Sequence, residues 1–483
     1  MANKEGIAMY EFFEYVLDQL KNSLILALLA LFAAGVVLLV AWLIHRAKFH
    51  GERKFPLVKA LLLIALVGYS VIVLYATILR FSGGYREVNF HLFRAWREAW
   101  NSFSPKNWAN VLLNVAMFVP LGFLLPAIWK PFRKWYLGIF AGLGVSAVIE
   151  LIQLATNRGI CDVDDLLANA FGAVIGYFLI MAVLSVFGDK GKRTRYTLLY
   201  GLLFLVSIFG ILGIFVIYEL QPYGNLPMAA TYTNDTSNVH WKVEYSSPVV
   251  PASLPVYRTQ SRSISDCDAF AEKFLTIIDT EYTTISYYEE AAYYMDQSGG
   301  DNGAHFLLVY YLDQSFDYTY RPSGRFGMQE PEWGDADRET LAGLLERFPV
   351  MLPEYAQFAT EGEGWYSFAV DRHVDGAMMI DGTLRCRYAS DGTLREIENH
   401  MLSYVYEDTV EVISPEEAVS RLQKGEFNDE GYFEYQAPGE VSILSCEVTY
   451  EIDTKGFYQP VYAFELKSDD GRYESRIIVP AMK

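Results

Sequence analysis

SAVIELIQLATNRGICDVDDLLANAFGAVIG, residues 146–176, places charged and amide side chains inside and between two apolar runs. Charges are costly in lipid, so they normally pair with one another and face a bundle interior or water. This stretch is therefore where a functional site is first expected. Its polar members are Glu150, Gln153, Arg158, Asp162, Asp164, Asp165 and Asn169.

Six apolar runs in the first 220 residues are each long enough to cross a hydrocarbon core as a helix of about 20 residues. Tryptophans fall at the ends of two of these runs, where aromatic belts are expected. We predict an all-α membrane bundle of six transmembrane helices over residues 23–220. The runs cover residues 23–44, 57–79, 108–129, 135–155, 166–187 and 196–218.

The net charge of −19 is unevenly spread over the 483 residues. Of 39 Lys and Arg, 20 lie at or before Gly224, against 13 of the 58 Asp and Glu, which leaves 19 basic against 45 acidic residues beyond it. The first part therefore carries +7 and the second −26. This division predicts a membrane domain followed by a water-exposed domain, and the acidic domain should repel nucleic acid.

Lys and Arg in the short loops set the expected orientation. Loops one, three and five carry the basic clusters, and the positive-inside rule places them in the cytoplasm. Loop two is mixed, and its segment 89–103 (NFHLFRAWREAWNSF) predicts an interfacial amphipathic helix. We expect a multi-pass plasma-membrane protein with both termini extracytoplasmic. The clusters are Arg46, Lys48, Arg53, Lys54 and Lys59; Lys130, Arg133 and Lys134; and Lys190, Lys192, Arg193 and Arg195.

The acidic half predicts a soluble, extracytoplasmic α+β domain with an antiparallel sheet over residues 241–483. Segment 1–22 is expected to be amphipathic, and QPYGNLP opens a linker over 221–240. Asp391–Gly392 predicts a hairpin turn, and Ser414 predicts the N-cap of a helix that ends before Gly425. Further elements are a helix over 266–279 and strands near 306–312, 442–451, 458–466 and 472–479.

The four cysteines are too few for a disulfide framework. None has CxxC spacing, which argues against a structural zinc site. An exported domain permits one disulfide bridge. The candidates for it are Cys267, Cys386 and Cys446.

The predicted topology brings polar residues from three spans to one membrane face, because span three starts, span four ends and span five starts there. Small residues recur every fourth position beside the polar residues of spans four and five. Such stripes let helices approach closely. Polar side chains on the same helix face should therefore point between helices. The candidate ligand-binding residues are Asn110, Asn114, Glu150, Gln153, Arg158, Asp162, Asp165 and Asn169.

These polar residues also have a structural interpretation. Asp162 or Asp164 would cap the fifth span. Arg158 would form an ion pair with Glu150 or Asp162, and the asparagines of span three would join helices by hydrogen bonds. A helical hairpin needs fewer costly groups than this stretch holds, which favours a site.

Three blocks of sequence resemble the VanZ-like membrane family, in family order and spacing. They are NVLLNVAMFVPLG (110–122), SAVIELIQ (146–153) and RGICDVDDLLANAFGAVIG (158–176). The resemblance covers about residues 55–190 and implies a role like resistance to the glycopeptide teicoplanin, with no established catalytic activity. The end of the chain, about 380–483, loosely resembles PepSY-, YycH- and YycI-like export-side modules.

The first functional hypothesis is a cell-envelope protein whose polar cluster binds an amphiphile at the outer leaflet. The ligand would be the head group of a lipid-linked wall precursor or a lipophilic glycopeptide antibiotic. Arg158 and the span-three asparagines would donate hydrogen bonds to it. Asp162 and Asp165 would hold a Mg²⁺ or Ca²⁺ ion that bridges to a pyrophosphate.

Two other functions stay open. The protein would be a membrane enzyme acting on polyprenyl-phosphate-type lipids, with Glu150 as general base and Asp162 and Asp165 as metal ligands. Alternatively, it would be an envelope sensor or interaction protein whose acidic domain binds a wall component or a partner protein through aromatic-rich strands.

Overall fold

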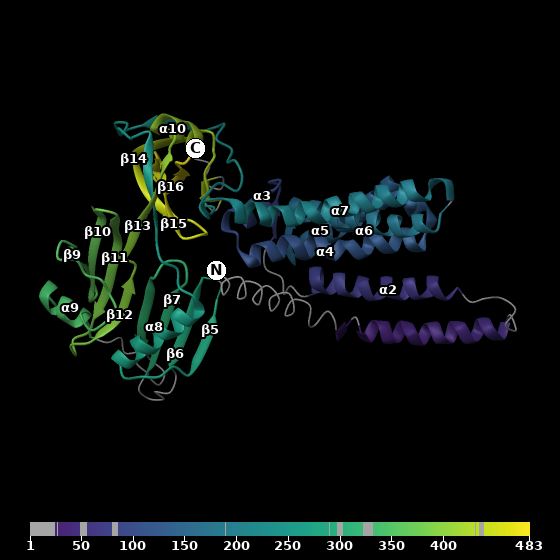
Figure 1. Ribbon diagram of the computed structural model, residues 1–483, viewed down its shortest axis with the longest axis horizontal. Coiled ribbons are helices and arrows are strands. Elements are labelled where there is room, and N and C mark those ends of the chain that lie inside the picture. The colour runs from purple at the N-terminus through teal and green to yellow at the C-terminus, as the bar shows by residue number, and fades with distance from the viewer. Residues whose placement is uncertain are drawn as a thin grey trace. The chain divides into compact units, whose positions relative to one another are not determined.

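The computed structural model describes residues 25–26, 28–48, 56–79, 86–188, 190–288, 290–296, 303–321, 332–429, 431–433 and 439–483. These residues belong to two compact units that divide between Pro222 and Tyr223 (Figure 1). The predicted amphipathic segment 1–22 and the basic residues Arg53 and Lys54 lie outside the described residues.

Six helices of the described residues are long and apolar enough to cross a membrane. The predicted six-helix bundle is therefore confirmed, and the protein is a multi-pass membrane protein. A π-helical turn, η1 (Tyr75–Leu79), follows α2, and a 3₁₀ turn, η2 (Lys130–Arg133), precedes α5. The helices are Leu28–Lys48, α2 (Leu57–Leu74), α4 (Pro105–Ile128), α5 (Trp135–Thr156), α6 (Val163–Val186) and α7 (Lys190–Leu220).

Helices α4 and α6 pack closely because α6 presents glycines to the backbone of α4. A Cβ atom on Gly172 would lie 1.9 Å from the carbonyl oxygen of Val115, and one on Gly176 would lie 2.0 Å from that of Val119. Only glycine fits at such separations, so the predicted small-residue stripe of α6 is a helix contact surface. This contact lies directly beside the polar residues at the start of α6.

Residues 86–104 fold against one end of the bundle (Figure 1). Helix α3 (Arg94–Ser102) lies within the segment 89–103 that was predicted to form an amphipathic helix. The apolar side of α3 packs Trp96 and Ala99 against Trp108 of α4 and Phe215 of α7. The polar side of α3 is thereby left to face water or a polar cavity.

A two-stranded ribbon joins two loops at the same end of the bundle. Strand β1 (Arg86–Asn89) precedes α3, and β2 (Gly159–Asp162) lies between α5 and α6. The two strands pair in parallel, with Asn89 opposite Asp162. No sequence pattern predicts this ribbon, because four-residue strands carry too little periodicity to be recognised.

The unit from Tyr223 to Lys483 is built on a mostly antiparallel sheet, as predicted. Its strands follow the order β3-β14-β15-β4-β13-β11-β12-β8-β7-β6-β5, with β10 and then β9 attached to β11 and β16 attached to β15. The elements are β3 (His240–Val243), β4 (Ser253–Arg258), α8 (Ile264–Ile277), β5 (Thr284–Tyr287), β6 (Ala291–Asp296), β7 (Ala304–Tyr310), β8 (Phe316–Arg321), α9 (Arg338–Leu345), β9 (Gln357–Gly362), β10 (Trp365–Asp375), β11 (Met378–Tyr388), β12 (Leu394–Asn399), β13 (Leu402–Glu411), α10 (Pro415–Gln423), β14 (Glu440–Ile452), β15 (Phe457–Ser468) and β16 (Glu474–Pro480).

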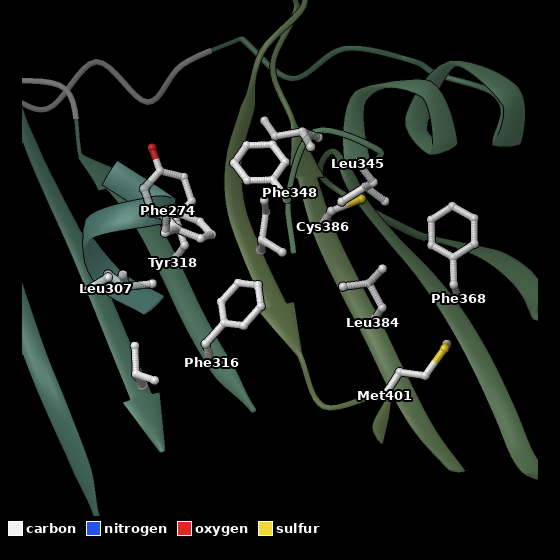
Figure 2. Packing of buried hydrophobic residues seen from close by; sticks show 14 of the residues in the cluster. Phe274, Leu307, Phe316, Tyr318, Leu345, Phe348, Phe368, Leu384, Cys386 and Met401 are labelled. Atoms are coloured by element: carbon white, nitrogen blue, oxygen red, sulfur yellow. The ribbon is translucent and has the colours of Figure 1, made fainter. Parts of the chain in front are cut away.

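The two largest hydrophobic cores among the described residues of this unit lie on the sheet. In the first, Phe274 of α8 and Leu345 of α9 pack with Phe316 of β8 and Leu384 of β11 (Figure 2). The second core gathers α10 and β14–β16. Because side chains alternate along a strand, the strands of the first core present their other residues on the opposite face of the sheet.

The start of this unit is held by specific contacts, although it lies within the predicted linker 221–240. The Gly224 N–H donates to the Asp453 carboxylate (2.6 Å), and the Asn234 side-chain amide donates to the carbonyl of Phe427 (2.8 Å). These bonds attach the segment to the sheet unit over most of its length.

The disulfide bridge that export would permit is not formed. All four cysteines are free. Cys267 and Cys386 are buried in the first core, and Cys446 is buried in the second. Their thiols act as small apolar core groups.

Candidate ligand-binding site

Asp162 organises the start of α6 and joins three elements there. Its carboxylate accepts hydrogen bonds from the backbone N–H of Asp164 (2.8 Å) and from the side-chain amide of Asn89 (2.9 Å). Its own backbone N–H donates to Oε2 of Glu150 on α5 (3.1 Å). The interpretation of Asp162 as a helix cap is therefore correct.

Asp164 holds helix α3 in place. One of its carboxylate oxygens accepts the Phe93 N–H (2.6 Å) and the other accepts the Ala95 N–H (2.8 Å). The first N–H groups of a helix have no partner within the helix, so a carboxylate there supplies the missing acceptor and also suits the helix dipole. Only 1% of the Asp164 surface is exposed, which marks it as an architectural residue.

Two asparagines join neighbouring helices. Asn114 Nδ2 on α4 donates to Asp165 Oδ1 on α6 (2.5 Å). One turn along α6, Asn169 Nδ2 donates to Ser146 Oγ on α5 (2.9 Å). The predicted hydrogen bonds between helices therefore exist at Asn114. Within the described part of the chain, the buried Oδ1 of Asn169 has no hydrogen-bond partner.

Gln153 ties α5 to the π-helical turn after α2. Its Nε2 donates to the backbone carbonyl of Thr77 (2.9 Å). A π-helical turn departs from the regular hydrogen-bond ladder of an α-helix, and Gln153 supplies a donor to it from a neighbouring helix. The side chain of Gln153 is itself buried.

Arg158 differs from the other predicted site residues. It lies just before β2, and its backbone N–H donates to the Gln153 carbonyl at the end of α5 (3.0 Å). Among the described residues, no ion pair joins its guanidinium to Glu150 or Asp162. The ion-pair interpretation of Arg158 is therefore not supported.

A polar cavity of about 120 Å³ lies where α3, α4 and the start of α6 meet. Helix α4 contributes three amides to it, helix α6 contributes carboxylates, and α3 contributes both an acidic and an aromatic side chain. The described lining residues are Ala95, Trp96, Glu98, Asn107, Asn110, Val111, Asn114, Asp164, Asp165 and Ala168.

The lining of this cavity determines which chemical groups it suits. It combines carboxylate acceptors with amides that both donate and accept hydrogen bonds. None of the described lining residues is basic. The cavity therefore suits hydroxyl, amide or amine groups, and like-charge repulsion disfavours a phosphate there.

The structure separates the predicted site residues into two groups. Asn110, Asn114 and Asp165 line the cavity together. The others lie outside its described lining, and Glu150, the candidate general base, is buried with 7% of its surface exposed. The residues outside the described lining are Glu150, Gln153, Arg158, Asp162 and Asn169.

Glu98 and Asn107 were not predicted to be site residues. Glu98 lies on α3 and Asn107 lies in the first turn of α4, and both line the cavity. The available signal was the amphipathic pattern of segment 89–103, since its polar side must face water or a polar cavity. Asp164 was recognised as polar, but its place in the lining was not predicted.

The predicted metal site gains no support from this arrangement. Among the described residues, no group of three or more His, Cys, Asp or Glu side chains is placed to hold a metal ion. The predicted ligands Asp162 and Asp165 instead accept hydrogen bonds from backbone and amide donors. These donors already use one lone pair on each bonded oxygen, so a Mg²⁺ or Ca²⁺ ion would have to share the carboxylates with them.

Fold and site together define a multi-pass membrane protein with a polar cavity at one end of its helical bundle. Comparison with known families makes this more specific. Residues 55–186 match the family model described as VanZ/LLP1, so this part of the chain is similar to that family of proteins. The matched range contains every predicted site residue.

The chain is also similar to a solved structure, the "Bacillus megaterium YpeB C-terminal domain". The two are 10% identical with a TM-score of 0.17, and the match covers 46% of this chain and 95% of that one. No curated protein matches the chain.

Proposed function

We propose that the polar cavity binds the head group of an amphiphilic cell-envelope molecule. The ligand would be a lipid-linked wall precursor or a lipophilic glycopeptide antibiotic. The observation that carries this proposal is the convergence of Asn110, Asn114 and Asp165 on one cavity beside the amphipathic helix α3. A cavity there has a polar interior next to the lipid that would hold the rest of the molecule.

Aromatic residues support a position of this cavity at head-group depth. Phe103, after α3, stacks on Tyr218 near the end of α7, with ring centroids 3.3 Å apart. Trp96 and Trp108 meet edge to face at 6.4 Å. Tyrosine and tryptophan gather at membrane–water interfaces because their rings are partly polar. This end of the bundle therefore suits the interface between lipid and water.

The basic residues support an extracytoplasmic position for the cavity. Lys130, Arg133 and Lys134 follow α4 at the end opposite the cavity, and Lys192 and Arg193 lie at the start of α7. By the positive-inside rule, that opposite end is cytoplasmic. The cavity and the end of α7 then lie on the extracytoplasmic side, which faces the cell wall.

The lining favours the sugar or peptide part of the head group over its phosphates. Carboxylates accept hydrogen bonds from hydroxyl, amide and amine groups, and the asparagine side chains both donate and accept hydrogen bonds. Arg158 lies outside the described lining, so our proposal differs from the sequence-based hypothesis in assigning no phosphate contact to it.

The test is binding of three molecules to the full chain in lipid nanodiscs. We expect a lipid-linked disaccharide–pentapeptide precursor or teicoplanin to bind, and undecaprenyl pyrophosphate to bind far more weakly. Asn110→Leu, which removes the amide and fills space, should lower affinity about tenfold or more. Arg158→Ala is the control and should bind like wild type. Equal binding by all variants, or selective binding of the pyrophosphate, would contradict the proposal.

A further inference from the structure

The sheet unit has a second hollow, on the face of β6–β8 that points away from the first core. Leu307 and Val309 of β7 point into that core. The alternate residues Phe306 and Leu308 point to the opposite face and line a hollow of about 230 Å³. The hollow is independent of the membrane cavity, since it belongs to the other unit.

Two aromatic rings form a platform in this hollow. The rings of Tyr293 and Phe306 lie 6.1 Å apart with 26° between their planes. The Arg321 guanidinium lies 5.4 Å from the Phe306 ring centroid, so it approaches the platform closely enough for a cation–π contact. Aromatic faces of this kind offer a flat apolar surface beside polar groups.

Polar side chains surround the platform with both donors and acceptors. Asp317 and Thr319 of β8 line the hollow together with Arg321. The Asp317 carboxylate is held by two donors, the Tyr310 hydroxyl (2.9 Å) and the His400 ring (2.9 Å). A fixed carboxylate and a guanidinium beside an aromatic surface can bond the hydroxyl groups of a ring whose C–H face rests on the platform.

Strand register extends the hollow into a row across the sheet. Phe306 pairs with Thr319, Thr319 with Glu396, Glu396 with Arg387 and Arg387 with Trp365. At roughly 4.8 Å between strands, this row is about 19 Å long. It begins and ends with an aromatic residue, so an extended ligand would find a stacking surface at each end.

The middle of this row is electrically compensated. Arg387 pairs with Glu396 (3.0 Å) and lies 3.7 Å from the centroid of the Trp333 ring. The part of the chain beyond Gly224 carries −26, which repels polyanions. An uncharged polymer therefore suits the row better than a nucleic acid or an anionic glycan.

We propose that this face binds an uncharged oligosaccharide, with one pyranose ring on Tyr293 and Phe306 and its hydroxyls bonded to Asp317 and Arg321. A peptide that adds a strand would need the unpaired backbone of a sheet edge. The hollow instead lies on the face of paired strands, where only side chains are available for recognition. An oligosaccharide meets this condition, because side chains can stack on its rings and form hydrogen bonds with its hydroxyl groups.

The test measures binding of chitotetraose to the full chain in detergent micelles, by calorimetry and by saturation-transfer NMR. We expect binding that weakens at least about tenfold in Tyr293→Ser and in Phe306→Ser. Tyr293→Phe retains the ring and should bind nearly as well as wild type. Tyr432→Ser removes a 61% exposed tyrosine from another part of the unit and serves as the matched control.

Folding is monitored by thermal unfolding, and Asp317→Asn supplies a variant that keeps the side-chain volume of the hollow. It should weaken chitotetraose binding because the amide replaces one acceptor by a donor. The proposal is overturned if wild type does not bind chitotetraose, or if the ring and Asp317 variants all bind equally. It is also overturned if a tetrapeptide of wall-stem composition competes for the same residues more tightly than the saccharide.

Discussion

The Asp164 carboxylate accepts the backbone N–H of Phe93 at 2.6 Å, a contact between residues 71 positions apart that fixes α3 to the start of α6. Asp164→Ala leaves two backbone N–H groups without their acceptor and should destabilise the membrane unit by roughly 2–3 kcal/mol. Asp164→Asn keeps one acceptor oxygen and should lose less stability than Asp164→Ala. Unfolding in mixed micelles measures both, and a wild-type stability for Asp164→Ala would contradict this role.

Gly176→Ala should disrupt the contact between α4 and α6. The added methyl group would lie 2.0 Å from the Val119 carbonyl oxygen, so the helices must separate. We expect lower yield and a lower melting temperature. Gly144→Ala on α5 is the matched control, because nothing lies within 4 Å of its Cβ position, and it should be neutral or slightly stabilising. Equal effects at the two positions would show that the close approach is not required.

Asn114→Ala should be costly because it leaves the Asp165 carboxylate without its donor from α4. The expected loss is about 1–2 kcal/mol for a hydrogen bond between membrane helices. A double-mutant cycle with Asp165→Ala separates the pair from other effects. The coupling should be favourable, and a coupling energy of zero would argue that the two side chains act independently.

His400 should make the stability of the sheet unit depend on pH. Its hydrogen bond to Asp317 raises the pKa of His400 above the usual 6.5. The folded state therefore binds this proton more tightly than the unfolded state. The stabilisation is complete below pH 6.5 and is lost as pH rises through the folded pKa. NMR titration measures that pKa, and Asp317→Asn should lower it. An unchanged pKa in that variant would contradict the assignment.

The cysteines of the sheet unit should stay reduced and react slowly. Burial raises the pKa of Cys267 and Cys386 to about 12 and that of Cys446 to about 11. Little thiolate is then present at neutral pH, and the thiolate is the reactive form. Mass spectrometry after iodoacetamide treatment should find these residues unmodified until the protein is denatured. A disulfide among them in the purified chain would contradict the structure.

The fold was predictable where the sequence repeats a signal many times. Apolar runs of about 20 residues predicted the six helices, and the alternation of apolar and polar residues predicted strands of the sheet. The site was predictable only in part. Asn110, Asn114 and Asp165 were recognised because polar groups are conspicuous inside apolar runs. Glu98 was not, because in an amphipathic segment an acidic residue is ordinary.

The remaining differences have one physical cause, which is that a side chain's partner is set by tertiary contacts. Asp162 accepts the Asn89 amide through the β1–β2 ribbon, and no local pattern announces a pairing of two four-residue strands. Arg158 has three acidic residues nearby in sequence. Two of them, Asp162 and Asp164, instead accept hydrogen bonds from backbone N–H groups at helix N-termini. Capping satisfies backbone groups that would otherwise be buried without partners.

The parallel pairing of β1 with β2 also has a consequence for the order of synthesis. The strand at residues 86–89 cannot meet its partner at 159–162 until α4 and α5 have both been made. Asp164, which caps α3, is made later still. Helix α3 therefore lacks its contact with Asp164 while two further spans, α4 and α5, are synthesised. The cavity lining is complete only after the first residues of α6 have been made. A ribosome that stalls before residue 164 leaves a chain with three of the spans that follow residue 56 and without the carboxylates that line the cavity.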